Sequence, residues 1–268
     1  MTDKKIVLIT GASSGLGFTI ANYLHGKGYT VYGTSRKITS EGKSFNTIPM
    51  DVCDPVSIQN CVSQIMQNEG KIDVLINNAG IGIAGPLEHF SMEDVGKVFD
   101  TNVFGVLKVC KAVLPHMRKA GAGKIINISS IGSELGLPYR AAYSASKAAM
   151  DRLSEAMRLE VKKYGIQICT VQPGGVNTDI NTNRILTEVP ENSPYKSSFE
   201  RTYSIINESV RKGLDPEVFG PFIEKLINAK KIKRNYRVGK ATEKLSVFLK
   251  KILPQSVFDN IISKHYKI

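Results

Sequence analysis

The sequence predicts an α/β protein built on a doubly wound parallel sheet of about seven strands. Short apolar runs alternate with helix-length segments, the first run ends in a glycine-rich turn, and neither an internal repeat nor a linker divides the chain. Connections of helix length between successive strands imply a parallel sheet with helices on both faces. Strands are expected over residues 6–9, 30–34, 46–50, 72–76, 124–128, 166–171 and 236–238, and helices over residues 15–27, from 55, over 92–117 and over 143–164.

Composition excludes several classes of protein. Hydrophobic residues make up 42% of the 268 residues and charged residues 22%, which are ordinary globular values and exclude disordered and fibrous chains. No apolar run approaches the roughly 20 residues of a membrane-spanning helix, and the chain starts without the apolar region of a signal peptide. The four cysteines and four histidines lack disulfide-framework or metal-ligand spacing. We therefore expect a cytoplasmic protein with reduced thiols and no metal.

The positive charge is concentrated at the C-terminus. The net charge is +12, and residues 229–268 hold eleven Lys or Arg against two acids. The main body is therefore nearly neutral, so we expect no nucleic-acid partner. We expect a catalytic and cofactor-binding domain over 1–228 and a basic amphipathic extension of the same domain over 229–268. The polar segment at 180–213 follows the sixth strand at its carboxyl end, so it is either a lid over the ligand site or a plain surface excursion.

A glycine-rich turn joins the first strand to a helix. Residues 10–17 read Thr-Gly-Ala-Ser-Ser-Gly-Leu-Gly. Glycines allow a tight turn and close approach of a pyrophosphate, and the helix N-terminus offers free N–H groups and a positive dipole end. The turn by itself also fits a simple strand-to-helix connection. Its place at the first strand–helix junction favours dinucleotide binding.

Tyr143 and Lys147 stand four residues apart at the start of an expected helix, so both side chains lie on one face. A free tyrosine is a poor base at neutral pH, but a neighbouring cation stabilises the phenolate. Proton transfer to or from a carbinol oxygen then becomes feasible. The pair is a weak signal without further motifs, because this spacing occurs by chance in many helices.

Six motifs in order and spacing resemble the short-chain dehydrogenase/reductase family, over residues 5–178. The resemblance implies a Rossmann-type fold and an oxidoreductase acting on CH–OH or C=O groups, similar to hydroxysteroid, retinol and keto-lipid reductases. The motifs are TGxxxGxG at residues 10–17, Asp51-Val52, Asn77-Asn78-Ala79-Gly80, Asn102, Ser130 with Tyr143-x-x-x-Lys147, and Pro173-Gly174-Gly175-Val176-Asn177-Thr178.

The resemblance also implies a catalytic tetrad of Asn102, Ser130, Tyr143 and Lys147. Tyr143 is the expected general acid in reduction and general base in oxidation. Ser130 is expected to orient the substrate oxygen, and the nearby Ser129 to be structural. Lys147 is expected to hold the nicotinamide ribose and support Tyr143, and Asn102 to hold a water in the proton relay.

The end of the second strand favours NADP(H) over NAD(H). An NAD site typically has an acid there, whereas this chain has Ser35 followed by Arg36 and Lys37. A guanidinium can grip a 2′-phosphate, although both cations also fit a solvated loop. By resemblance, Asp51 meets the adenine amino group. The residues expected to bind the cofactor are Gly11, Ser13, Ser14, Gly15, Leu16, Gly17, Ser35, Arg36, Lys37, Asp51, Val52, Asn78, Ala79, Gly80, Tyr143, Lys147, Pro173, Gly174, Val176 and Thr178.

The basic extension contains two amphipathic stripes. One helix is expected over residues 240–253, and a second begins after Pro254 with a capped start at Ser256. The stripes either pack on the body or a partner subunit, or contact an anionic membrane and cover a lipophilic substrate channel. Glu134, which departs from the small apolar residues of many relatives, is expected to line the substrate mouth or, as we favour, to face water.

These observations predict an NADP(H)-dependent reductase of a lipophilic carbonyl compound, of steroid, retinoid or long-chain keto-lipid type. By resemblance, a homodimer or homotetramer is expected through the helices at 92–117 and 143–164. Two alternatives remain: an NAD-linked alcohol dehydrogenase, and a non-catalytic NADP-sensing or scaffold protein on the same fold.

Overall fold

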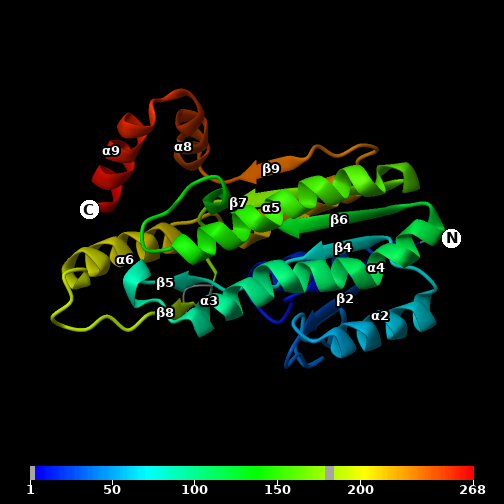
Figure 1. Ribbon diagram of the computed structural model, residues 1–268. Coiled ribbons are helices and arrows are strands. Elements are labelled where there is room, and N and C mark those ends of the chain that lie inside the picture. Colours follow the sequence, from blue (N-terminus) through cyan, green and yellow to red (C-terminus); the bar gives the residue numbers. More distant parts are fainter. Residues whose placement is uncertain (1–3, 179–183) are drawn as a thin grey trace.

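A single parallel sheet of seven strands organises the molecule (Figure 1). The computed structural model describes residues 4–178 and 184–268. The strand order is β3-β2-β1-β4-β6-β7-β9, which confirms the predicted doubly wound sheet. Its strands are β1 (Ile6–Thr10), β2 (Thr30–Ser35), β3 (Asn46–Pro49), β4 (Val74–Asn77), β6 (Gly123–Ile128), β7 (Ile166–Pro173) and β9 (Asn235–Val238), and β5 (Ile83–Ala84) pairs with β8 (Ile185–Leu186) in a separate small sheet.

Helices cover both faces of the sheet. Packing places α2, α4 and α5 on one face and α1 and α7 on the other. Among the described residues, no helix has the length and hydropathy needed to cross a membrane. The helices are α1 (Gly15–Gly26), α2 (Pro55–Glu69), α3 (Met92–Phe99), α4 (Val106–Ala120), α5 (Ala141–Val161), α6 (Lys196–Arg211), α7 (Phe219–Asn228), α8 (Ala241–Ile252) and α9 (Gln255–Tyr266).

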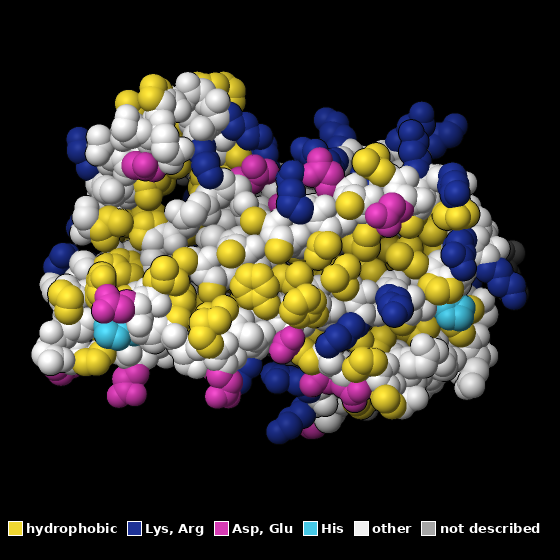
Figure 2. Space-filling model, viewed as in Figure 1, with side chains coloured by type: hydrophobic (Ala, Val, Ile, Leu, Met, Phe, Trp, Pro, Cys, Tyr) yellow, Lys and Arg dark blue, Asp and Glu magenta, His cyan; other side chains and the backbone are white. Residues whose placement is uncertain are grey.

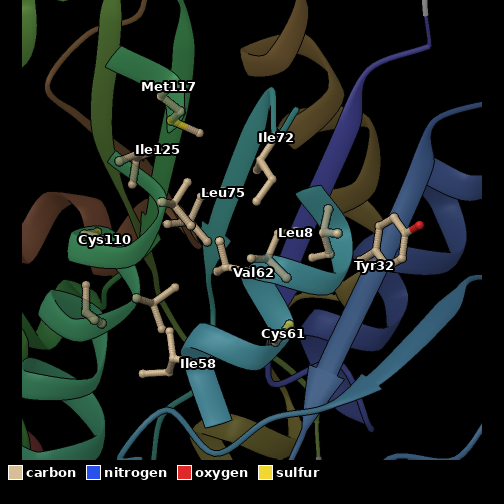
Figure 3. Close-up of a cluster of buried hydrophobic side chains, with 14 of the residues drawn as sticks. Leu8, Tyr32, Ile58, Cys61, Val62, Ile72, Leu75, Cys110, Met117 and Ile125 are labelled. Atoms are coloured by element: carbon tan, nitrogen blue, oxygen red, sulfur yellow. The ribbon is translucent and has the colours of Figure 1, made fainter. Parts of the chain in front are cut away.

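Two hydrophobic cores form because successive strand residues point to opposite faces. Leu8 and Leu75 pack toward α2 and α4, where Ile58 and Val62 meet them (Figure 3). The neighbouring residue Ile9 packs on the opposite face, in the second core with α1 and α7. Burial on both faces explains why these strands read as continuous apolar runs rather than alternating patterns.

The helix predicted at residues 92–117 is interrupted by a wider turn. A π-helical segment, Asp100–Gly105, separates α3 from α4. A Cβ on Gly105 would lie 2.9 Å from a methyl carbon of Val52, so glycine allows the segment to lie close to the loop that follows β3. The six-residue π-helical segment contains the buried Asn102. Such segments are frequent at functional sites.

Several predicted boundaries differ from the structure. The fourth strand begins at Val74 rather than at residue 72. The predicted cap at Ser256 is wrong, because α9 begins at Gln255 with Pro254 preceding it. The segment predicted as a lid over 180–213 contains β8 and α6, and its residues 180–183 lie outside the described part of the chain.

The basic C-terminal extension folds back on the body. It supplies β9 at the sheet edge, and α8 and α9 then form an arch above the carboxyl end of β7 (Figure 1). Val247 and Phe258 are buried in a small core with Ile131 and Leu135. Leu249 and Ile262 pack partly against this core, whereas Leu245, Phe248, Ile252, Val257 and Ile261 are exposed. The predicted stripes therefore divide between packing on the body and contact with solvent.

Candidate active site

The strand order reverses between β1 and β4, and a cleft opens at their carboxyl ends. From this point the chain runs outward through β2 and β3 on one side and through β6, β7 and β9 on the other. Ligands of doubly wound sheets bind at such a switch point. The cleft has a volume of about 1390 Å³ and is lined by residues of every predicted motif except Asn102.

Hydrogen bonds tie the glycine-rich turn to the segment after β4. Thr10 Oγ1 accepts from the backbone N–H groups of Asn78 and Ala79, both at 3.0 Å. The Asn78 side-chain amide donates to the carbonyls of Thr10 at 3.1 Å and Gly11 at 2.8 Å. Asn78 therefore holds the turn in place, and Gly11 adopts a φ of 69° that favours glycine.

The start of α1 forms a cradle beside this turn. Ser14 precedes the helix and makes no side-chain capping bond, so it leaves the first N–H groups of α1 without a side-chain acceptor at the cleft. Gly15 has a φ of 57°, and a Cβ there would lie 3.5 Å from Cβ of Thr178, across the cleft. The backbone and the helix dipole fit the pyrophosphate of a dinucleotide.

The second and third strands contribute the far end of the cleft. Ser35 and Arg36 line it, whereas Lys37 is exposed and is not among the lining residues. Asp51 and Val52 also line it, and Asp51 Oδ1 accepts from the backbone N–H of Cys53 at 2.8 Å. Arg36 therefore has access to a ligand in this part of the cleft.

Tyr143, Lys147 and Ser130 meet at the opposite end. Tyr143 lies in the first turn of α5, and the buried Lys147 donates from Nζ to the carbonyl of Ile128 at 3.0 Å. Ser130 Oγ accepts from the N–H of Gly132 at 3.0 Å. A Cβ on Gly132 would lie 3.2 Å from Ser130 Oγ and 3.6 Å from Cε1 of Tyr143, so both side chains border the same small space.

Asn102 lies behind this cluster rather than in the cleft wall. Its side chain donates to the carbonyl of Ile81 at 2.9 Å and to Ser146 Oγ at 3.1 Å, and it accepts from the N–H of Ile81 at 2.9 Å. A Cβ on Gly80 would lie 3.1 Å from Asn102 Oδ1 and 3.4 Å from Lys147 Nζ. Asn102 thus fixes the backbone beside Lys147.

Glu134 is not among the residues that line the cleft, and its side chain is only 19% exposed, so it meets water in part and does not border the substrate. Its carboxylate pairs with Arg237 at 3.0 Å and accepts from Gln172 at 3.2 Å. Burial acts to raise the pKa of Glu134, but the hydrogen bonds from Arg237 and Gln172 outweigh it and keep that pKa below its usual value. The neighbouring Ser129 is buried as expected for a structural residue, and its backbone N–H donates to Val171 at 2.7 Å.

The sequence reasoning missed most of the cleft's outer wall. Glu243 of α8 accepts from the N–H of Gly175 and from the N–H of Lys240, both at 2.7 Å. Its position in the first turn of α8 is a typical capping position, which could have suggested the second contact. Lining residues that no motif indicated include the apolar Ile205, Ile206, Val210, Leu245, Leu249, Ile261 and Ile262, and the polar or charged Arg140, Arg184, Glu208, Ser209, Lys212, Lys240, Thr242, Ser246, His265 and Tyr266.

No metal cluster accompanies these residues: within the described ranges, no group of three or more His, Cys, Asp or Glu side chains is arranged to hold an ion. Cys110, on the buried face of α4, receives a hydrogen bond from Asn77 at 3.4 Å. Burial raises the pKa of its thiol to about 12, which is the behaviour of a core cysteine and not of a nucleophile.

Known proteins match this chain over most or nearly all of its length. The family model described as short chain dehydrogenase matches residues 5–188. A Bacteroides thetaiotaomicron protein named 3-ketodihydrosphingosine reductase is 43% identical over 267 residues, which are 99% of each chain. Human retinol dehydrogenase 8 is 36% identical over 199 residues, covering 69% of this chain and 63% of that protein. The crystal structure of a short-chain dehydrogenase from Streptomyces avermitilis covers 98% of both chains, with a TM-score of 0.82 and 28% identity.

The packing of Gly17 gives a prediction about the cradle. A Cβ at this position would lie 2.3 Å from the carbonyl oxygen of Gly11 and 2.4 Å from Asn78 Nδ2, so Gly17→Ala should displace the turn. We expect a loss of about 1–3 kcal/mol in the free energy of unfolding, measured by denaturant titration. Gly26 in the same helix has no atom within 4 Å of an added Cβ, and Gly26→Ala is the matched control. Equal losses in the two variants would contradict this account of the turn.

Proposed function

Because the chain belongs to the short-chain dehydrogenase family, and is therefore an oxidoreductase that works with a nicotinamide cofactor, we propose that it is an NADP(H)-dependent reductase of long-chain keto-lipids. The observation that carries the proposal is the meeting of Tyr143, Lys147 and Ser130 at one end of a cleft whose outer wall is largely apolar. The similarity to proteins named 3-ketodihydrosphingosine reductase and retinol dehydrogenase 8 supports a lipophilic substrate.

The proposed roles follow from the geometry of the cluster. A bound nicotinamide supplies hydride chemistry. Tyr143 protonates the substrate oxygen, and Ser130, whose hydroxyl already accepts from Gly132, donates a hydrogen bond to the same oxygen. Lys147 uses one donor on Ile128, which leaves the rest of its ammonium for the cofactor ribose and for support of Tyr143. Asn102 positions the backbone at Ile81.

The proposed cofactor site extends from the glycine cradle to Arg36. In this proposal the cradle at Gly11–Leu16 binds the pyrophosphate, and Asp51 and Val52 contact the adenine. Pro173, Gly174, Val176 and Thr178, which line the cleft opposite, take the nicotinamide amide. Arg36 takes the 2′-phosphate, whereas the exposed Lys37 contributes at most long-range attraction.

We also propose that the protein forms a homo-oligomer through the outer surface of α4 and α5. Figure 2 shows hydrophobic side chains gathered over these two helices. Phe104, in the π-helical segment just before α4, is 48% exposed, and Leu159 of α5 is 72% exposed. Apolar patches of this kind mark interaction sites. The mass in solution, from light scattering, tests the proposal.

The catalytic proposal predicts the behaviour of Tyr143→Phe. The phenol is the proton donor, so its loss should lower carbonyl reduction by about 10²–10⁴-fold while NADPH binding is retained. Turnover is followed at the absorbance of NADPH and binding by its fluorescence. Near-normal turnover would remove Tyr143 from the mechanism. A wild-type protein that binds NADPH but reduces no carbonyl compound would instead favour the non-catalytic alternative.

Arg36 predicts a difference between the two cofactors. Only NADPH has a 2′-phosphate, so Arg36→Ala should weaken NADPH binding by roughly 10- to 150-fold and change NADH binding far less. Lys37→Ala is the matched control, because Lys37 is exposed outside the cleft wall. Dissociation constants for both cofactors give the answer. Equal losses for the two cofactors would show that Arg36 does not bind the 2′-phosphate.

The exposed residues of the tail support contact with an anionic membrane. Phe248 is 57% exposed and Ile252 is 58% exposed on one face of α8, beside Lys244 and Lys251. A basic amphipathic surface of this kind rests on anionic lipid. We propose that the arch docks on the membrane and opens the apolar cleft toward it.

Vesicle binding tests this contact. The protein should sediment with phosphatidylglycerol vesicles more than with phosphatidylcholine vesicles, and less as salt rises. Replacing Phe248 and Ile252 together by Ser should weaken this binding by at least about tenfold, because two apolar side chains no longer enter the lipid. Val56, which is 67% exposed on α2, provides the control Val56→Ser. No sedimentation at low salt would end the proposal.

A further inference from the structure

Two arginines line the cleft beside Tyr143. Arg140 directly precedes α5, and Arg184 directly precedes β8. The pairing of β8 with β5 brings Arg184 close, since the N–H of Ile185 donates to the carbonyl of Gly82 at 2.9 Å. A Cβ on Gly82 would lie 3.3 Å from Nε of Arg184, so the side chain runs along the backbone at this point.

Neither guanidinium has a carboxylate partner within residues 4–178 and 184–268. Nη1 of Arg184 and Nε of Arg140 are buried and make no hydrogen bond in that part of the chain. Their neighbours are aromatic. The guanidinium carbon of Arg184 lies 5.7 Å from the centroid of the Tyr203 ring, and that of Arg140 lies 5.9 Å from the centroid of the Tyr266 ring. Nη2 of Arg140 also donates to the Tyr266 hydroxyl at 2.8 Å.

Two neighbouring cations that have no carboxylate partner among the described residues are electrostatically unfavourable. Burial lowers the pKa of Arg184 below its usual value, and the charge of Arg140 lowers it further. A buried donor without an acceptor is also unfavourable. An anion between the two guanidinium groups would relieve both effects, and planar guanidinium groups match phosphate and carboxylate oxygens with paired hydrogen bonds.

The phosphates of the cofactor do not explain this pair. In the proposed site they lie at the cradle before α1 and at Arg36, whereas Arg140 and Arg184 stand at the Tyr143 end, where the substrate oxygen is protonated. Apolar side chains also line the cleft, namely Leu137, Ile185 and, from the tail helices, Leu245, Leu249, Ile261 and Ile262. Glu208 is an acid in the lining, and it pairs with Lys212. The unmatched charge therefore faces the substrate.

We propose that Arg140 and Arg184 bind an anionic group, a phosphate monoester or a carboxylate, which the carbonyl substrate carries close to its ketone. The inference rests on the proposed reductase function and narrows it to keto-lipids with an anionic head. The apolar wall takes the acyl chain, and the two guanidinium groups set the distance between the head group and the reacting carbon.

The inference is tested by measuring KM, with NADPH in excess, for a set of ketones that have the same acyl-chain length and different head groups. The set holds a phosphate monoester, a carboxylate, a neutral alcohol and a primary amine, for which 3-ketodihydrosphingosine serves. The anionic ketones should have the lowest KM, and the two anions separate phosphate from carboxylate. Arg184→Gln should raise KM for the preferred anionic ketone at least about tenfold more than KM for the neutral one. The control Arg152→Gln, on the exposed part of α5, should change neither.

Binding without turnover separates this inference from the reductase proposal. Octyl phosphate should bind the NADP⁺-loaded wild type in calorimetry and bind Arg184→Gln at least about tenfold more weakly, with NADP⁺ binding and the melting temperature confirming that the variant is folded. Octyl phosphate binding without reduction of any ketone would reject the reductase and keep the anion site. A preference for the amine, or equal KM values across the set together with no octyl phosphate binding, would overturn the anion site and leave the reductase standing.

Discussion

The hydrogen bonds between Thr10 and Asn78 are the constraint on which the site depends. The chain leaves β1 and β4 in opposite directions, so the switch point opens a gap at the centre of the sheet. Thr10 Oγ1 and the Asn78 amide bridge that gap from both sides, with four bonds between 2.8 and 3.1 Å. The glycine turn, and with it the direction in which α1 begins, is thereby fixed relative to the segment after β4, whose Gly80 lies beside Lys147 of α5.

A chain of buried side-chain hydrogen bonds links the sheet to α5. The Asn77 side chain donates to Asn127 at 2.8 Å, and Asn127 donates to Ser154 at 2.7 Å. Buried hydrogen bonds of this kind hold the elements they join in one relative position. Ser154 lies on the same helix as Tyr143, so the helix that bears the proposed acid is anchored to β4 and β6 through polar contacts as well as apolar ones.

The features that could be predicted from the sequence are those determined by residues close together in the chain. Apolar runs predicted the sheet, and the glycine spacing predicted the cradle, because each depends on residues close together in the chain. The π-helical segment was not visible, since it depends on the contact of Gly105 with Val52. Arg184 was not visible either, because only the pairing of β5 with β8 brings it beside Tyr143. The tail helices carried clear stripes, but their location depends on packing with Ile131 and Leu135.

Glu243 makes the tail and the loop after β7 a single unit for protein engineering. Its carboxylate is the acceptor for the N–H of Gly175, and a Cβ on Gly174 would collide with it at 2.0 Å. A chimaera that exchanges residues 241–268 for another tail, in order to change the substrate, therefore removes an acceptor from the loop after β7, which is proposed to bind the cofactor. An unpaired N–H there costs about 1–3 kcal/mol. Tail grafts should accordingly keep an acid at the position of Glu243. The residues that line the proposed substrate site can then be changed without weakening cofactor binding.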